Sequence, residues 1–244
     1  MSGQPVEIEV FRYRPDVEEE GSWERYSIPC HPDDTLLDAL HHIKEQLDPT
    51  LSYRWSCRSG VCGSCALSVD GTPRLACATR IAALGARVRV APLANFAVLR
   101  DLAVDVEDLG ERQRAVSPWL LADAAPAPEP AVPLESPAAL AAYAGFAACI
   151  QCGICDAACP ALGRQPRFVG PSAVTLAWRY ARDARDRGVE RRHRVLAGER
   201  GVWNCTQSQA CTSVCPQDVD PAHAVQRSQL LTALRALGLV RGKP

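Results

Sequence analysis

Residues 57–65 read Cys-Arg-Ser-Gly-Val-Cys-Gly-Ser-Cys, and a further cysteine, Cys77, follows a short distance along the chain. Three cysteines of one loop can reach a single metal centre only if the backbone bends around it. Gly60 and Gly63 allow such a bend and leave backbone N–H groups free to point at the sulfurs. The Cys-x4-Cys-x2-Cys spacing with a distant fourth cysteine is typical of a 2Fe–2S cluster. The predicted ligands are Cys57, Cys62, Cys65 and Cys77.

A structural zinc site is the alternative for this first centre. Zinc sites favour paired Cys-x2–4-Cys knuckles that come from two separate turns. Here three cysteines share one loop with glycines between them, which favours the iron–sulfur interpretation.

Two further cysteine runs lie in the second half of the chain. Cys149-x2-Cys152-x2-Cys155-x3-Cys159 is followed by Pro160, and Cys205-x5-Cys211-x3-Cys215 is followed by Pro216. The first of these matches the bacterial ferredoxin run, whose fourth cysteine serves the other cluster of a two-cluster domain. If each run gives its last cysteine to the cluster of the other run, a 4Fe–4S cluster is predicted with the ligands Cys149, Cys152, Cys155 and Cys215. This exchange leaves Cys159, Cys205 and Cys211 for a third cluster.

The third cluster has one cysteine too few for a 4Fe–4S centre. A complete run would carry a cysteine at position 208, but Ser208 stands there. A serine alkoxide is a poor ligand for a soft iron–sulfur site, so three thiolates favour a 3Fe–4S cluster. The alternative is a 4Fe–4S cluster with Ser208 or water at the open corner.

Composition narrows the class of protein. Apolar residues make up 47% and charged residues 23% of 244 residues, an ordinary globular balance. The sequence contains no run of 18 apolar residues, so no membrane span is predicted. The N-terminus lacks the pattern of a signal peptide, which predicts that the chain stays in the reducing cytoplasm. Twelve cysteines are too few for a disulfide scaffold. The sequence contains no Gly-x-Gly-x-x-Gly dinucleotide-binding motif, no Walker phosphate-binding loop and no Gly-x-Ser-x-Gly hydrolase motif.

Hydrophobic patterning predicts two different halves. Strands are expected at 6–13, 24–29, 66–70, 74–76 and 87–91, with a helix from 36 to about 47, which suits a small mixed sheet packed on one helix. Five prolines between 122 and 139 predict extended geometry and the seam between domains. Helices are expected beyond it, including 172–186, ended by Gly188, and 221–237.

Charge is unevenly distributed. Residues 101–135 hold eight acids against two arginines, and residues 164–200 hold ten arginines against four acids. The arginines form either a solvated helix face or a docking surface for a partner subunit or an anionic membrane. The one cysteine outside the runs, Cys30, is interpreted as a bystander thiol.

Together these residues resemble the iron–sulfur subunit of the succinate dehydrogenase/fumarate reductase family, respiratory complex II. Within it the chain looks most similar to bacterial quinol:fumarate reductase. The resemblance covers almost the whole chain. It is carried by Leu51–Arg58, Ala94-Asn95-Phe96, Arg100-Asp101-Leu102, Gly170-Pro171-Ser172-Ala173 through Arg179-Tyr180, Gly201–Thr206, and Cys215-Pro216 through Ala222.

The resemblance implies an α+β fold, with an N-terminal plant-type ferredoxin (β-grasp) domain followed by an all-α, bacterial-ferredoxin-like domain. The expected limits are residues 1–105 for the 2Fe–2S domain, 106–140 for an acidic, Pro/Ala-rich connection and 141–244 for the helical domain with the 4Fe–4S and 3Fe–4S clusters.

The resemblance also implies a function in electron transfer. Electrons would pass between the FAD of a separate flavoprotein subunit and a membrane quinone, through the 2Fe–2S, 4Fe–4S and 3Fe–4S clusters in turn. The succinate/fumarate site would lie on the flavoprotein. Membrane-anchor subunits would hold the chain at the cytoplasmic face of the cell membrane, and no nucleic-acid partner is expected. The direction of the reaction cannot be read from this chain.

Two alternatives stay open. One is the iron–sulfur subunit of another flavoprotein dehydrogenase or thiol-linked fumarate reductase, although such relatives often append Cys-Cys-Gly modules that this sequence lacks. The other is a zinc-stapled interaction module.

The resemblance places five residues near the quinone: Pro160, Thr206, Ser208, Arg227 and Gln229. Ubiquinone-linked relatives carry a tryptophan shortly after the first Cys-Pro, whereas here Ala161-Leu162-Gly163 follow, which favours menaquinone. In similar fumarate reductases a lysine of the last helix lies near the quinone. Gln229 occupies the matching position and can donate a hydrogen bond but brings no charge.

Overall fold

The computed structural model describes residues 4–17, 19–121 and 135–240. It divides into two compact units: the first extends to Val106 and includes Ile150–Ala158, and the second comprises Glu107–Cys149 and the chain from Cys159 onward. The domain limits at 105 and 140 stay predictions. In the structure Ile150–Ala158, which carries two of the cysteines, belongs to the same unit as the N-terminal strands.

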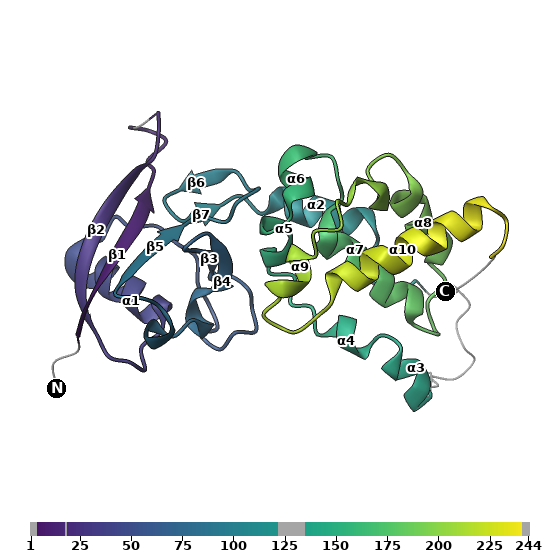
Figure 1. The fold of residues 1–244 in the computed structure, drawn as a ribbon, viewed down its shortest axis with the longest axis horizontal. Helices are drawn as coiled ribbons and strands as arrows, with labels where there is room; N and C mark the ends of the chain where they lie inside the picture. Colours follow the sequence, from purple (N-terminus) through teal and green to yellow (C-terminus); the bar gives the residue numbers. More distant parts are fainter. Residues whose placement is uncertain (1–3, 18, 122–134, 241–244) are drawn as a thin grey trace, which may run out of the picture. The chain divides into compact units, whose positions relative to one another are not determined.

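The first unit is built on a five-stranded mixed sheet with the strand order β2-β1-β5-β3-β4 (Figure 1). β1 and β5 are parallel, while the β1–β2, β3–β5 and β3–β4 pairs are antiparallel. All five strands expected from the sequence are present. Their bounds are β1 Gln4–Arg12, β2 Ser22–Cys30, β3 Ala66–Val69, β4 Thr72–Leu75 and β5 Arg87–Ala91.

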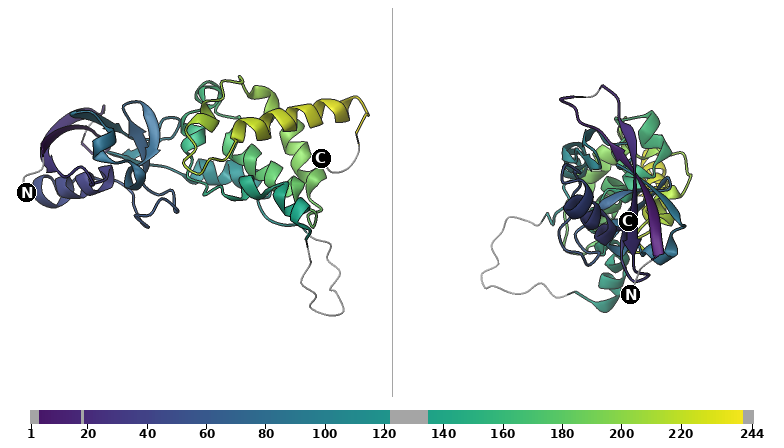
Figure 2. Two further views of the ribbon diagram at one scale, coloured as in Figure 1. Left: turned by 60° about the horizontal axis from the view of Figure 1, so that its bottom comes forward. Right: turned by 90° about the vertical axis from the view of Figure 1, so that its left-hand side faces the viewer.

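One helix covers this sheet, as expected, and Figure 2 shows it lying along one side of the strands. α1 (Leu36–His42) begins at Thr35, whose hydroxyl accepts a hydrogen bond from the Asp38 amide in a capping box. The helix continues as one π-helical turn, η1 (Ile43–Leu47). Its apolar face is fully buried, as are the strand residues Ile8 and Val88, which are direct cross-strand partners. Burial of this alternating face fixes the register, because a one-residue slip would expose it.

The hairpin between β3 and β4 turns at Asp70-Gly71. Both residues have positive φ, +49° and +77°, the geometry of the two-residue hairpin turn that favours Asp-Gly. The strand β4 then leads into a 3-10 turn, η2 (Ala76–Ala78), which carries Cys77. The hairpin therefore returns Cys77 towards the loop that holds the other three cysteines.

Arg12 at the end of β1 is buried and connects four segments of the first unit. Its guanidinium donates to Asp101 at 3.1 Å, Thr50 at 2.8 Å and Asp48. Burial alone would lower the pKa of Arg12, but the hydrogen bonds to Asp48 and Asp101 raise it above its usual value. Arg12 therefore stays charged and ties β1 to the segments on either side of the cysteine loop.

The same network depresses the pKa of a carboxyl group. Burial would raise the pKa of Asp48, but hydrogen bonds from Thr50 and Arg12 hold it well below its usual value. Because the folded pKa lies below the unfolded value of about 3.9, the charged carboxylate stabilises the fold above that pH. This stabilisation is lost as the pH falls through the folded pKa.

A feature that the sequence patterning missed follows the sheet. β6 (Val98–Arg100) and β7 (Ala103–Val104) form a small antiparallel pair, turning at Asp101 with φ +47°. Strands of two or three residues are too short to show an alternating pattern.

The second unit is helical within the described residues, and its central helix is α7 (Gly170–Arg182). α7 is buried over most of its length and contacts α2, α4, α8 and α10. The elements of this unit are α2 Glu107–Ala115, α3 Pro137–Ala141, α4 Ala144–Ala147, α6 Pro160–Arg164, α8 Val189–Ala197, η4 Val202–Asn204, α9 Ala210–Ser213 and α10 Pro221–Ala236. α5 (Ile154–Ala157) belongs to the first unit. The structure therefore confirms the α+β class.

Two helix ends differ from the prediction. α7 stops at Arg182 rather than 186, because Asp183 leaves the helix and its buried carboxylate accepts hydrogen bonds from Arg179 at 3.0 Å and Arg185 at 2.8 Å. Gly188, expected to end this helix, instead precedes α8. The prediction for 221–237 is confirmed, with Gly238 at φ +70° just beyond α10.

The proline-rich stretch was predicted to be extended throughout. Residues 122–134 lie outside the described part of the chain. Beyond them the prediction is wrong, because Pro137 begins α3, with Ser136 as its N-cap. Proline is compatible with the first helical turn, where its missing N–H has no intrahelical partner.

Several arginines of the 164–200 stretch are structural rather than solvated. Arg192 is buried and forms two hydrogen bonds with Asp186, at 2.6 and 3.0 Å. It also donates to the carbonyl groups of Ser117 and Trp119 at 3.0 and 2.7 Å. This pair fastens α8 to the segment that follows α2.

Within the described residues, no helix is both long enough and apolar enough to cross a membrane.

The Arg12 network predicts a large effect for Asp101→Asn. Asp101 is fully buried and also accepts hydrogen bonds from the Tyr13 and Ser52 amides, at 3.0 and 2.8 Å. Asparagine keeps the shape and tolerates the positive φ but leaves Arg12 without one carboxylate. We expect a loss of about 2–4 kcal/mol in the free energy of unfolding, measured by denaturant titration of the full chain.

Asp33→Asn is the matched control, because Asp33 is an exposed carboxylate paired with Arg80 at 3.6 Å. An exposed pair contributes at most about 1 kcal/mol. Equal losses in the two variants would contradict the central role of the buried network.

Candidate metal centres

The first cysteine loop runs from the end of η1 to the start of β3 and is shaped by three residues with left-handed backbone. Arg58, Gly60 and Gly63 have φ of +57°, +75° and +73°. The Ala76 amide donates to the Cys65 carbonyl at 3.0 Å, which holds the loop against the turn that carries Cys77.

Backbone amides point at two of these sulfurs. The Ser59 amide donates to Cys57 Sγ at 3.4 Å, and the Cys77 amide donates to Cys65 Sγ at 3.5 Å. The bond from Ser59, with a further one from the Cys62 thiol, lowers the pKa of Cys57 to about 6. Burial raises the pKa of Cys65 to about 12, with added contributions from Cys77 and Cys62.

The four predicted ligands of the first centre therefore influence one another, Cys57 through Cys62, and Cys65 through Cys62 and Cys77. Close thiolates repel unless a positive centre lies among them, and amide donors to sulfur are a regular feature of iron–sulfur sites. No three His, Cys, Asp or Glu side chains of residues 4–17, 19–121 and 135–240 converge on a single-ion site. A 2Fe–2S cluster distributes its four thiolates over two iron atoms, and four neighbouring cysteines with amide donors to their sulfurs fit such a cluster.

The second run has the same kind of turn. Gln151 and Gly153 have φ of +57° and +75° on either side of Cys152, and α5 begins directly afterwards. The Asn95 side chain donates to the carbonyl groups of Asp156 and Ala157, at 2.9 and 3.1 Å. These bonds hold the end of α5 within the first unit.

The turn at Cys152 also lies against the first cysteine loop. A Cβ atom placed on Gly63 would come within 2.6 Å of the Cys152 Cβ. A glycine is therefore required at position 63 for two reasons, its left-handed φ and this close approach.

The third run repeats the second with different residues. Gln207 and Gln209 have φ of +59° and +60° on either side of Ser208, and α9 begins at Ala210 as α5 begins at Ile154. The Gln207 amide donates to Cys205 Sγ at 3.4 Å. The backbone thus places Ser208 where the second run has Cys152.

Three cysteines of the second unit lie close together. Burial, together with the charges of Cys159 and Cys205, raises the pKa of Cys211 to about 11. Cys159 is buried at the start of α6, and Cys205 packs against the same hydrophobic core. Their arrangement fits a cluster for the reason given for the first loop.

The four predicted ligands of the 4Fe–4S cluster are divided between the units. Cys152 and Cys155 belong to the first unit, while Cys149 and Cys215 belong to the second. This ligand set stays a prediction. Cys30, the cysteine outside the runs, is buried at the end of β2, and burial raises the pKa of its thiol.

The five residues expected near the quinone lie in the third cysteine turn, at the start of α6 and on α10. Thr206 and Ser208 are exposed in the third cysteine turn, and Pro160 is exposed at the start of α6. The Arg227 guanidinium donates to the His223 ring at 3.0 Å. Arg227 lines a separate pocket between α4, α7 and α10.

Gln229 is engaged inside the protein at both ends of its amide. Its Nε2 donates to the Val202 carbonyl at 2.9 Å, and its Oε1 accepts from Gln207 Nε2 at 2.5 Å. Gln229 therefore holds the Gln207 turn, whose backbone amide faces Cys205. Sequence reasoning missed Gln207, since no spacing rule singles out a glutamine whose contribution is a backbone amide.

Comparison with known proteins also indicates iron–sulfur cluster domains. Residues 7–111 match the family model of a 2Fe-2S iron-sulfur cluster binding domain, and residues 145–219 match that of a 4Fe-4S dicluster domain. The fumarate reductase iron-sulfur subunit of Haemophilus influenzae is 43% identical, over 96% of this chain and 95% of that protein. The subunit of the same name from Mycobacterium tuberculosis is 44% identical, over 95% and 94%.

A solved structure agrees as well. A chain of the Mycobacterium smegmatis Sdh1 complex in the apo form superposes with a TM-score of 0.85 at 25% identity, covering 96% of this chain and 98% of that chain. The similarity spans both units and all three cysteine runs. The chain therefore belongs to the family of iron–sulfur subunits of fumarate reductase and succinate dehydrogenase, and it serves such an oxidoreductase as its electron-transfer subunit.

Proposed function

We propose that the chain carries electrons between the FAD of a flavoprotein subunit and a membrane quinone, through one 2Fe–2S, one 4Fe–4S and one 3Fe–4S cluster. The observation that carries the proposal is the match of both cluster-domain models over all eleven clustered cysteines. The proposed ligands are Cys57, Cys62, Cys65 and Cys77 for 2Fe–2S, Cys149, Cys152, Cys155 and Cys215 for 4Fe–4S, and Cys159, Cys205 and Cys211 for 3Fe–4S.

Strand order and turn geometry support the finer fold assignment. A mixed sheet in the order β2-β1-β5-β3-β4 with one covering helix supports a plant-type, β-grasp ferredoxin at the N-terminus, over residues 1–105. The repeated turn–helix pattern of α5 and α9 supports a bacterial-ferredoxin-like region within 141–244. Residues 106–140 would connect the two.

The clusters, when bound, supply one-electron carriers whose potentials depend on cluster type, hydrogen bonds to sulfur and solvent exposure. The chain differs among its centres in these respects. Two of the four ligands proposed for the first centre are buried, Cys65 and Cys77, and one of the three proposed for the third, Cys159. Ser208 in place of a fourth thiolate adds a difference in cluster type.

Close approach of two turns supports the order of transfer. Cys62 precedes Gly63, and the Gly63 backbone lies against Cys152 without an intervening side chain. Ligands of the proposed first and second clusters are therefore linked by a short path within the first unit. Gly63 contributes by leaving that path open.

Partners follow from the family. The curated relatives are named as subunits, so we infer a flavoprotein subunit and membrane-anchor subunits, with the chain at the cytoplasmic face of the membrane. The quinone would bind beside the third cysteine turn, near Pro160, Thr206 and Ser208. The absence of tryptophan at Ala161-Leu162-Gly163 favours menaquinone.

Electron paramagnetic resonance of the anaerobically purified complex tests the proposal. We expect a 3Fe–4S signal in the oxidised state and a 2Fe–2S signal on reduction. Ser208→Cys restores the missing ligand, so the oxidised 3Fe–4S signal should be lost and replaced by a second reduced 4Fe–4S signal. Two 4Fe–4S signals in the unchanged, undamaged protein would contradict the assignment of the third cluster.

Iron content tests the first ligand set. Cys77→Ala should lower the iron content by about two atoms per chain, the content of one 2Fe–2S cluster, and abolish its reduced signal. Cys30→Ala is the matched control, because Cys30 is also a buried cysteine of the first unit but lies outside the cluster loop. Loss of iron in the Cys30 variant, or full iron in the Cys77 variant, would overturn this ligand set.

Gln229→Leu tests the role of the last helix. The variant removes both hydrogen bonds of Gln229, which loosens the Gln207 turn and its amide contact with Cys205. Because fewer donors to sulfur favour the oxidised state, we expect the midpoint potential of the third cluster to fall by about 30 mV, a threefold change for one electron.

Redox titration of the resonance signals would measure this shift. Gln226→Leu, which removes only a 3.4 Å contact with Gln207, should shift the potential less. An unchanged potential together with weakened quinone binding would show instead that Gln229 contacts the quinone directly.

A further inference from the structure

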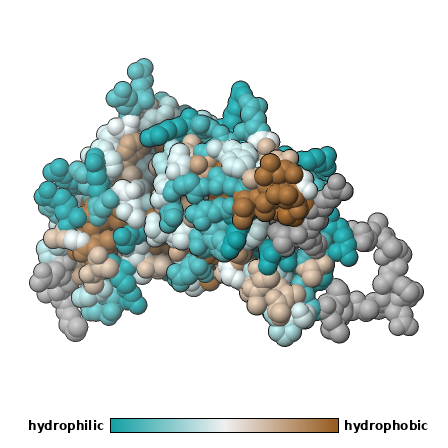
Figure 3. Space-filling model, turned by 45° about the vertical axis from the view of Figure 1, so that its right-hand side comes forward, coloured by the Kyte–Doolittle hydropathy of each residue, from teal (hydrophilic) through white to brown (hydrophobic). Residues whose placement is uncertain are grey.

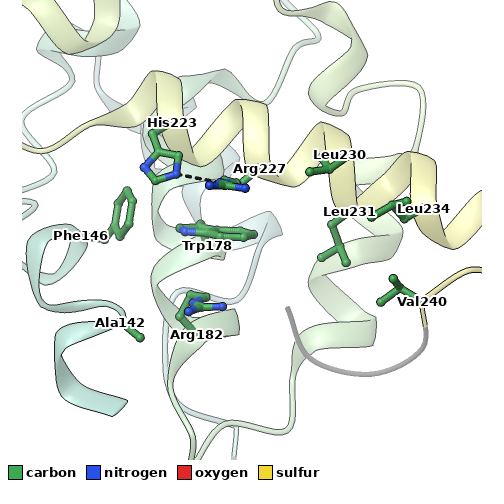
Figure 4. Close-up of a pocket in the computed structure, with 10 residues that line it drawn as sticks. All are labelled: Ala142, Phe146, Trp178, Arg182, His223, Arg227, Leu230, Leu231, Leu234 and Val240. Atoms are coloured by element: carbon green, nitrogen blue, oxygen red, sulfur yellow. Dashed lines mark hydrogen bonds between the residues drawn. The ribbon is translucent and has the colours of Figure 1, made fainter. Parts of the chain in front are cut away.

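The helical unit contains a pocket that no part of the electron path uses. It lies between α10, α7 and α4 and has a volume of about 510 Å³, a size typical of ligand pockets (Figure 4). Figure 4 shows Trp178 at its centre, with Phe146 on one side and the leucines of α10 on the other. The side chains that matter here are Phe146, Trp178, Arg182, Arg227, Leu231 and Leu234.

The pocket carries positive charge, and no carboxylate in the described part of the chain compensates it. Arg182 lies over the Trp178 ring at 5.8 Å, and Arg227 donates to the His223 ring. No acidic side chain lines the pocket, and neither arginine forms an ion pair with the carboxylates of the described residues. Other arginines of this unit are held by Asp183 and Asp186.

The rest of the pocket is apolar and continues onto the surface. Leu231, Leu234 and Val240 form its wall at the C-terminal end of α10. Leu230, which also lines the pocket, is 49% exposed, and Leu237 and Leu239 beyond it are 72% and 68% exposed. Figure 3 shows hydrophobic surface gathered on this face. Exposed apolar surface of this kind, next to basic groups, is characteristic of sites that meet a ligand or a membrane.

We propose that this pocket binds an anionic phospholipid, with an acyl chain along the leucine wall and the phosphate at the arginines that line the pocket, Arg182 and Arg227. Guanidinium groups bind phosphate through paired hydrogen bonds, and the aromatic ring under Arg182 holds its plane in place. A small soluble anion would leave the leucines uncovered, and a neutral apolar ligand would leave both arginines without a counter-ion.

The site is separate from the third cysteine turn. Gln229 and Gln226 contact Gln207, whereas the pocket is lined by His223, Arg227 and neighbours one turn apart along another side of α10. Lipid bound here would give the chain its own contact with the bilayer, independent of the proposed quinone site and of the proposed anchor subunits.

Trp178 provides a direct readout, because bromine atoms on an acyl chain quench a nearby indole. The full chain is mixed with vesicles of brominated phosphatidylglycerol in phosphatidylcholine, and with brominated phosphatidylcholine alone. We expect saturable quenching by the anionic lipid only, and loss of most of this quenching in Trp178→Phe. Equal quenching by both lipids would overturn the proposal, as would quenching that persists in the Trp178 variant.

Charge variants test the headgroup contact. Arg182→Gln with Arg227→Gln should weaken binding roughly tenfold or more, since each basic side chain near an anionic lipid contributes to affinity. Arg182→Lys with Arg227→Lys should restore part of the binding, which excludes a folding defect as the cause of the loss. Iron content would also reveal such a defect. Arg191→Gln on α8, an exposed arginine outside the pocket, is the matched control and should bind normally.

Two results would refute the lipid assignment. An equal loss in the Arg191 variant would show attraction to net charge rather than to this pocket. Displacement of the Trp178 signal by an acidic amphipathic peptide, with no response to lipid, would assign the pocket to a protein partner.

Discussion

Each cysteine run must bend sharply enough for several sulfurs to face one point, and the backbone meets this constraint with left-handed residues. Gly60 and Gly63 adopt that conformation easily, whereas Gln151, Gln207 and Gln209 adopt it as non-glycine residues. In the first and third runs, amides two residues beyond a cysteine point at its sulfur. The sheet, the hairpin and the short helices hold these bends in place. The arrangement of these elements therefore depends on the bends of the cysteine runs.

The strands, the hairpin turn and the long helices could be predicted because each has a local cause. Alternating residues predicted β1 and β5, Asp70-Gly71 predicted the turn, and Pro221 and Gly238 predicted the limits of α10. Tertiary contacts decided the remaining elements. α7 ends early because Asp183 is held by two arginines, which no local pattern shows.

The candidate site could be predicted at the level of residue type and spacing, since the cysteine runs and Ser208 are visible in the sequence. Backbone contributions could not be predicted. Gln207 matters through its amide and through a side-chain bond to Gln229, a residue on a distant helix. The expected quinone contact of Gln229 rested on position alone, and the structure shows both ends of its amide already engaged.

The arginine-rich stretch shows how burial separates residues of one type. Arg192 is buried against Asp186, so the cost of removing its charge from water is offset by a paired carboxylate and backbone carbonyls. Arg182 lies over an aromatic ring and Arg227 donates to an imidazole, and neither forms an ion pair with a carboxylate of the described residues, so both remain able to bind an external anion. The arginines of this unit therefore have two different roles. The paired members fasten helices, and the unpaired members, beside exposed leucines, form the surface through which this unit can bind an anionic lipid.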